Sequence, residues 1–176
     1  MIIVGVDPGA SGAIAFLDAD TNTLLDVHDM PIDRTQIGKF VRSRVARRAL
    51  LDLLNRARGA VVFTERPEGR PMRQTNKKTG QTELRQPGAQ GMLSLGENYG
   101  CVIMACTAAD MSVTEVRPGQ WKGAIGVPAA KDDARRRATE LFPAHAAKFV
   151  RVKDDGRAES ALIAYYGARK MGRTQP

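Results

Sequence analysis

The chain has 176 residues, 43% of them hydrophobic, and carries 27 Lys and Arg against 19 Asp and Glu. This length and composition are typical of one folded domain with a substantial core, and they argue against a disordered chain. No apolar stretch reaches the roughly 18 residues of a membrane span, and no charged leader precedes the short apolar start, so we expect neither a membrane partner nor a secretion signal. The net charge of +8 at pH 7 favours a polyanionic partner, most often nucleic acid, although solubility alone could account for it.

Hydrophobic patterning and turn residues predict five strands and four helices. Asn22 falls in the turn between the second and third strands, so the first three strands should form an antiparallel meander. The order predicts an α/β fold, a mixed five-stranded sheet flanked by helices, in a single domain over residues 1–176. The strands are expected at 2–6, 12–17, 24–27, 60–64 and 112–116, and the helices at 35–58, 90–106, 131–142 and 155–170.

The helix expected at 35–58 depends on apolar residues at near-helical spacing, with arginines between them and a glycine at its end. The two cysteines, Cys101 and Cys106, share the next predicted helix without a CxxC pair, which is typical of reduced core residues in an intracellular protein. The two histidines stand far from either cysteine in sequence, so no zinc site is expected.

Four acidic residues stand where side chains of a functional site gather. Asp7 closes the first strand before the turn PGASG, and Glu65 closes the fourth strand. Asp155 and Glu159 are four residues apart on the last predicted helix, so they share one face. The rest of that helix is apolar nearly all round, which predicts that Glu159 is at least partly buried.

Each acid also has a local explanation. Asp155 is a good N-cap, the commoner role for an aspartate before a helix; Asp7 could cap its turn, Glu65 could pair with Arg66, and Glu159 could be solvated. Taken together, clustered carboxylates repel one another, and Mg²⁺ or Mn²⁺ would remove that repulsion. Two such ions, roughly 3.5–4 Å apart, would clamp the attacking water and the leaving oxygen of a phosphodiester, so the sequence indicates a nuclease.

Four segments, in this order, resemble the RuvC-type Holliday junction resolvases, most nearly their phage and chloroplast branch. They are GVDPGASG at 5–12, FTERP at 63–67, KDDARR at 131–136 and DGRAESALIA at 155–164. The resemblance implies an RNase H-like fold, a homodimer, and two-metal cleavage of four-way junctions in the cytoplasm of a bacterial cell or a phage-infected host. It gives metal-binding roles to Asp7, Glu65, Asp155 and Glu159, and no small-molecule cofactor. One departure is that no aromatic follows shortly after Glu65, where bacterial members carry one that helps to open the junction centre.

Basic residues supply the expected DNA contacts. Lys131 stands at a helix start, where a cation opposes the macrodipole but is well placed to meet a phosphate. The resemblance also puts a functional lysine there; an exposed lysine without a role is the competing interpretation, and Lys122 is a second candidate. The segment at about 66–88 is expected to be a mobile loop that binds the sugar-phosphate backbone, or else an ordinary solvated loop. Its basic residues are Arg66, Arg70, Arg73, Lys77, Lys78 and Arg85.

The sequence therefore predicts a divalent-metal-dependent endonuclease that resolves Holliday junctions and related branched DNA. The alternatives are another RNase H-like nuclease, such as an exonuclease, and a junction-binding protein without catalysis. A sugar-kinase or actin-like fold also begins with an aspartate-glycine turn. It needs a second similar domain, for which 176 residues without a repeat leave no room.

Overall fold

The computed structural model describes residues 1–69, 72–75, 80, 82–85, 88–128 and 132–173, without the side chains of Ile37, residues 72–75, Glu83 and Arg85. A five-stranded mixed sheet forms the centre, with strand order β3-β2-β1-β6-β9. The first three strands form the predicted antiparallel meander, and β1, β6 and β9 are parallel to one another. The strands are β1 (Ile2–Asp7), β2 (Ala13–Asp18), β3 (Thr23–Asp29), β6 (Val61–Glu65) and β9 (Ser112–Val116).

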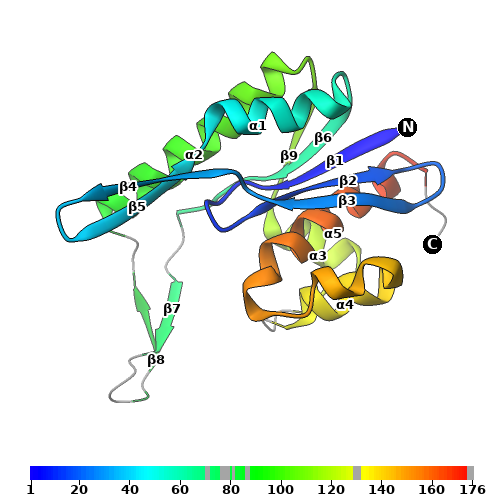
Figure 1. The fold of residues 1–176 in the computed structure, drawn as a ribbon. Coiled ribbons are helices and arrows are strands. Elements are labelled where there is room, and N and C mark those ends of the chain that lie inside the picture. Colours follow the sequence, from blue (N-terminus) through cyan, green and yellow to red (C-terminus); the bar gives the residue numbers. More distant parts are fainter. Residues whose placement is uncertain (70–71, 76–79, 81, 86–87, 129–131, 174–176) are drawn as a thin grey trace.

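Helices cover both faces of this sheet (Figure 1). On one face lie α1 (Arg47–Leu54) and α2 (Ala89–Ala108), and on the other α3 (Pro118–Ala124), α4 (Asp133–Leu141) and α5 (Asp155–Lys170). Successive residues of a strand point to opposite faces, so Ile3 joins the core under α5 while Val4 and Val6 join the core under α1 and α2. Burial on both sides explains why β1 is a continuous apolar run. Short 3₁₀ turns, η1 (Asn55–Ala57), η2 (Pro143–Lys148) and η3 (Val152–Asp154), connect the elements.

The prediction of a helix at 35–58 is wrong. The segment instead forms a hairpin of β4 (Ile32–Ile37) and β5 (Phe40–Val45), and α1 occupies only Arg47–Leu54. Gly38 explains the difference, because it has a φ of +59° at the first position of a two-residue turn, a conformation that glycine adopts without strain.

The segment after Glu65 also contains regular structure. β7 (Met72–Thr75) and β8 (Thr82–Arg85) pair as an antiparallel hairpin, so part of the segment expected as a mobile loop is a pair of strands, while its mobility stays a prediction. The helix α3 was not predicted, and α4 begins two residues after the expected start. In the described part of the chain, no helix is both long enough and apolar enough to cross a bilayer.

Candidate active site at one edge of the sheet

Asp7 and Glu65 lie at the same edge of the sheet. β1 and β6 run parallel, with Val6 opposite Thr64, so the next residue of each strand is an acid. β9 is parallel to β6, with Val116 opposite Glu65, and α3 therefore begins beside the same edge. The parallel topology alone thus collects side chains from three strand ends and the following helix.

Close packing of α5 against β1 brings Glu159 to this edge. A Cβ added at Gly5 would lie 2.1 Å from the backbone oxygen of Ser160, and one added at Gly156 would lie 2.6 Å from the backbone oxygen of Ser11. Neither position has room for a methyl group, so glycine is required at both. The first turn of α5 therefore lies directly on the turn that follows Asp7.

The carboxylates of Asp7, Glu65 and Glu159 act on one another electrostatically. The pKa of Asp7 is raised from 3.8 to about 7, first by burial and then by the charges of Glu159 and Glu65, against the opposing effects of the Gly9 N–H and Lys122. Burial likewise raises the pKa of Glu65, with Glu159 adding to the effect and a hydrogen bond from Trp121 opposing it. Such a cluster of mutually destabilised acids is typical of a functional site rather than of a structural ion pair.

Two adjacent residues of α3 hold these acids. The buried indole of Trp121 donates its Nε1–H to Glu65 Oε2 at 2.8 Å. The ammonium of Lys122 lies 2.7 Å from Glu159 Oε1 and 5.1 Å from the centre of the Trp121 ring. Trp121 is thus buried in the core, and its polar atom also orients Glu65. Lys122 supplies a positive charge at the centre of the acidic cluster.

Asp155 has a different partner. Its Oδ1 lies 2.7 Å from Arg135 Nε, close enough for an ion pair although the two atoms are not aligned as a hydrogen bond. Arg135 also pairs with Asp132, and Asp154 rather than Asp155 occupies the N-cap position of α5. The structure therefore brings Asp7, Glu65 and Glu159 together and places Asp155 one helical turn away, against α4.

Similar proteins are found only by comparison with solved structures. No protein-family model matches the sequence, and no curated protein does. Among solved structures, T. thermophilus RuvC in complex with a Holliday junction substrate matches with a TM-score of 0.60 at 16% identity, covering 100% of this chain and 99% of that chain. The fold is that of RuvC. A second Thermus thermophilus RuvC structure gives a TM-score of 0.53 at 16% identity, over 97% of this chain and 96% of that one.

The RuvC likeness confirms the predicted mixed five-stranded sheet between helices. A likeness at 16% identity establishes the fold, while the phage and chloroplast branch stays a prediction.

The donor set suits a hard divalent cation in its chemistry, since all three clustered side chains are carboxylates. Among the residues that the structure describes, no three His, Cys, Asp or Glu side chains are arranged to hold a metal ion. Lys122 engages Glu159 and Trp121 engages Glu65, so both acids are held by other partners.

Most of the predicted DNA contacts fall outside what the structure describes. Lys131, Arg70, Lys77 and Lys78 lie outside the described residues, and the side chains of Arg73 and Arg85 are not described. Arg66 lies 3.6 Å from Glu115 in an exposed ion pair, and is not paired with Glu65 as one alternative suggested. Lys122 is therefore the predicted basic residue that the structure places at the carboxylates.

Sequence patterns missed two residues of the site. Trp121 donates to an acid 56 positions away, and Arg135 reaches Asp155 across 20 positions. The available signal was Pro118, which marks the start of a helix directly after the last strand. A helix that begins at the same edge as the acidic strand ends is placed to contribute to the site.

Proposed function

We propose that the chain is a divalent-metal-dependent, structure-selective endonuclease that cleaves Holliday junctions and related branched DNA. The observation that carries the proposal is the convergence of Asp7, Glu65 and Glu159, with a raised pKa at Asp7, at one edge of a RuvC fold. The net charge of +8 supports a polyanionic substrate. A catalytic role explains why a folded protein keeps three mutually repelling acids together.

Asp7, Glu65 and Glu159 would hold Mg²⁺ or Mn²⁺, with Asp155 as a fourth ligand once it leaves Arg135. The bound ions would supply a nucleophilic water and stabilise negative charge on the leaving oxygen. Trp121 restricts the orientation of Glu65 through the bond to Oε2, which would leave Oε1 of this acid for a cation. Lys122, released from Glu159, is placed to meet a phosphate; Lys131 remains a further candidate for that role.

The test is cleavage of a synthetic four-way junction in Mg²⁺ or Mn²⁺. Asp7→Asn should reduce the rate by roughly 100-fold or more, because it removes a ligand charge at the centre of the site. The matched control is Asp52→Asn, which changes an exposed acid that pairs with Arg48 on α1. Equal cleavage by the wild type and Asp7→Asn would contradict the site assignment. Equal cleavage of junctions and linear duplex would reject the junction preference but keep a nuclease.

The proposal includes a homodimer that uses the outward face of α2. Leu93 and Met104 are 58% and 66% exposed, and a Cβ at Gly96 or Gly100 would meet no atom within 4 Å. These four positions share one stripe of the helix. Open space at both glycines supports an intermolecular contact for this stripe, rather than packing on the chain's own sheet.

A further inference from the structure

The β4–β5 hairpin leaves the sheet from the edge that carries the acids. β3 runs parallel to β1 through the meander, and the pairings Asp7–Ala13 and Ala13–Asp29 place the end of β3 beside Asp7. The hairpin follows β3 directly, and Figure 1 shows it projecting beyond this end of the sheet. A segment that starts here projects outward from the edge of the sheet that carries the acids.

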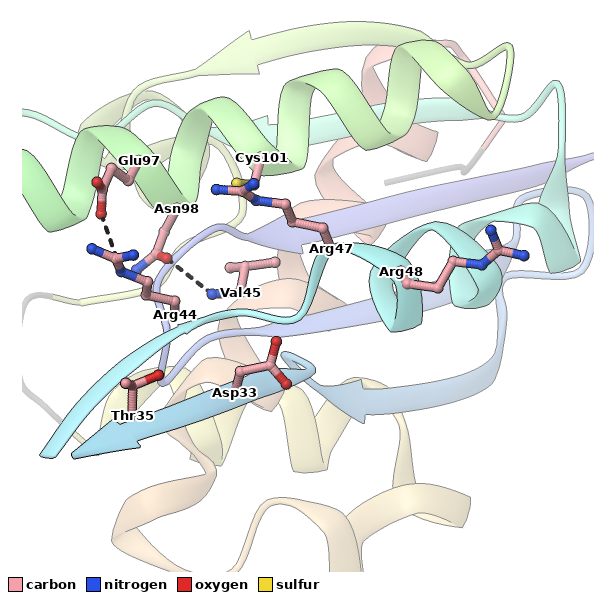
Figure 2. Close-up of a pocket in the computed structure, with 9 residues that line it drawn as sticks. All are labelled: Asp33, Thr35, Arg44, Val45, Arg47, Arg48, Glu97, Asn98 and Cys101. Carbon is pink, nitrogen blue, oxygen red and sulfur yellow. Dashed lines mark hydrogen bonds and ion pairs between the residues drawn. The ribbon is translucent and has the colours of Figure 1, made fainter.

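Three contacts fix the base of the hairpin. The Met30 N–H donates to the Gly12 carbonyl at 2.9 Å, tying the hairpin to the turn after Asp7. The Val45 N–H donates at 3.1 Å to Oδ1 of the buried Asn98 on α2, and Figure 2 shows this bond beside the ion pair of Arg44 with Glu97. The hairpin is therefore a preorganised arm, which reduces the entropy lost on binding.

The strand register divides the hairpin into two faces. Asp33, Thr35 and Arg44 share the face toward α2, where they line the pocket of Figure 2. Arg34 and Ser43 are paired across the strands on the opposite face, so they point toward the turn at residues 10–12, which follows Asp7. A groove of about 620 Å³ lies between that face and the turn, lined also by residues 10–12, Asp29, Lys153 and Asp154.

The acids of this groove are already neutralised. Asp29 accepts two hydrogen bonds from Arg157, at 2.5 and 2.6 Å, and these hold its pKa below the usual range. Asp154 is bound by Arg151 at 2.8 Å, which lowers its pKa in the same way. Each carboxylate therefore faces the groove as half of an ion pair, with little net charge.

The cations of the groove have no such partners. Within the described part of the chain, neither Arg34 nor Lys153 has an ion pair or a hydrogen bond with an acid, and both are exposed. They stand on different elements, one on β4 and one on η3, on either side of the groove. Two unneutralised cations that line a groove beside the proposed phosphodiester-cleaving site are complementary to a chain of phosphates.

We propose that this groove binds the sugar-phosphate backbone of one DNA arm next to the cleaved strand, with Arg34 and Lys153 as phosphate contacts. The inference rests on the proposed function and adds a DNA path beside β3, the edge strand that β4 follows. Arg34 offers a planar fork to the phosphate oxygens, and Lys153 a mobile point charge. Both contacts are to the backbone, so they set the position of the arm without reading its sequence.

The test measures binding of a labelled four-way junction by fluorescence anisotropy, without divalent metal, over a series of salt concentrations. Arg34→Ala and Lys153→Ala should each weaken binding roughly three- to tenfold and reduce the slope of log K against log salt by about 1. The matched control is Lys170→Ala, which removes the same charge from the exposed C-terminal end of α5. It should change affinity less than twofold. Circular dichroism and thermal unfolding confirm that the exposed substitutions leave the fold intact.

The outcomes separate this inference from the proposed function. The inference is overturned if the wild type binds and cleaves junctions while Arg34→Ala and Lys153→Ala lose no more affinity than Lys170→Ala. It is also overturned if either variant lowers the cleavage rate at saturating protein without changing affinity, since a phosphate contact in a positioning groove acts on binding. If the wild type neither binds nor cleaves DNA, the proposed function fails first and this inference with it.

Discussion

Replacement of Asp7 by Asn should stabilise the folded protein at alkaline pH. The pKa of Asp7 is about 7 in the folded state against an ordinary value of 3.8, with burial as the main cause. Each step of one in pKa corresponds to about 1.36 kcal/mol, so ionised Asp7 costs the folded state roughly 4 kcal/mol. Asn has nearly the same shape and keeps an oxygen for the Gly9 N–H, which lies 3.4 Å from Oδ1.

The sign of the pH dependence of stability follows from the number of protons bound in the folded and unfolded states. Between pH 4 and pH 7 the folded state keeps a proton on Asp7 that the unfolded state has lost, so stability falls as pH rises through this window and is level above it. The stabilisation by Asp7→Asn should therefore be absent near pH 4 and largest at pH 8. We expect 2–4 kcal/mol there, or on the order of 10 °C in Tm, because the coupled acids Glu65 and Glu159 share part of the cost.

The assay is thermal and urea unfolding of the wild type and Asp7→Asn from pH 4 to pH 8. Asp18→Asn is the control of opposite sign, because the Asp20 N–H and the Thr21 hydroxyl lower the pKa of Asp18. Millimolar Mn²⁺ should raise the Tm of the wild type at pH 8 and have little effect on Asp7→Asn, since binding to the folded state alone stabilises it. A stabilisation by Asp7→Asn that is equal at pH 4 and pH 8, or absent at both, would refute the electrostatic reasoning.

Three further substitutions test other parts of the site and the dimer. Trp121→Phe keeps an aromatic ring but removes the hydrogen-bond donor that lowers the pKa of Glu65. The acidic limb of the pH–rate profile should therefore move to higher pH, and cleavage should slow by about tenfold or more. An unchanged profile would contradict the role of the indole. Lys122→Met should tighten Mn²⁺ binding several-fold in calorimetry while slowing cleavage, because it removes a competing cation from Glu159; weaker metal binding would show that Lys122 does not compete. Gly100→Arg on the exposed stripe of α2 should convert a dimer to a monomer, as measured by light scattering. It should not lower the Tm, because arginine has a higher helix propensity than glycine. An unchanged molecular mass would place the dimer interface elsewhere.

The acids were predictable because two local patterns located them. A buried apolar run that ends in an acid placed Asp7 and Glu65 at strand ends, and parallel pairing then put them side by side. Spacing along α5 predicted that Glu159 would share a face with Asp155, but not that Arg135 would hold Asp155 against α4. That ion pair, like the bond from Trp121 to Glu65, depends on how distant helices pack, which no local pattern contains.

The hairpin shows how one residue decides between two periodicities. Val41 and Val45 are four apart, which fits a helix, yet they also alternate with Arg42 and Arg44, which fits a strand. Gly38 decides in favour of the strand, because its left-handed backbone conformation makes a tight reversal. Because this segment is a hairpin and not a helix, Arg34 and Ser43 lie on one face, toward the turn that follows Asp7. The wrong prediction of a helix at 35–58 therefore concealed a candidate binding surface.

The fit of α5 against β1 through Gly5 and Gly156 has a consequence for how proteins of this fold can diversify. Because backbone meets backbone there, the spacing between Asp7 and Glu159 is set by the polypeptide itself and not by adjustable side chains. The two hairpins begin only after the site's strands have ended, so their length and charge are free to change while the acids stay in register. If the proposed activity is correct, chimeras that exchange residues 32–45 for the equivalent segment of another protein of this fold should therefore keep their chemistry and acquire a new choice of substrate.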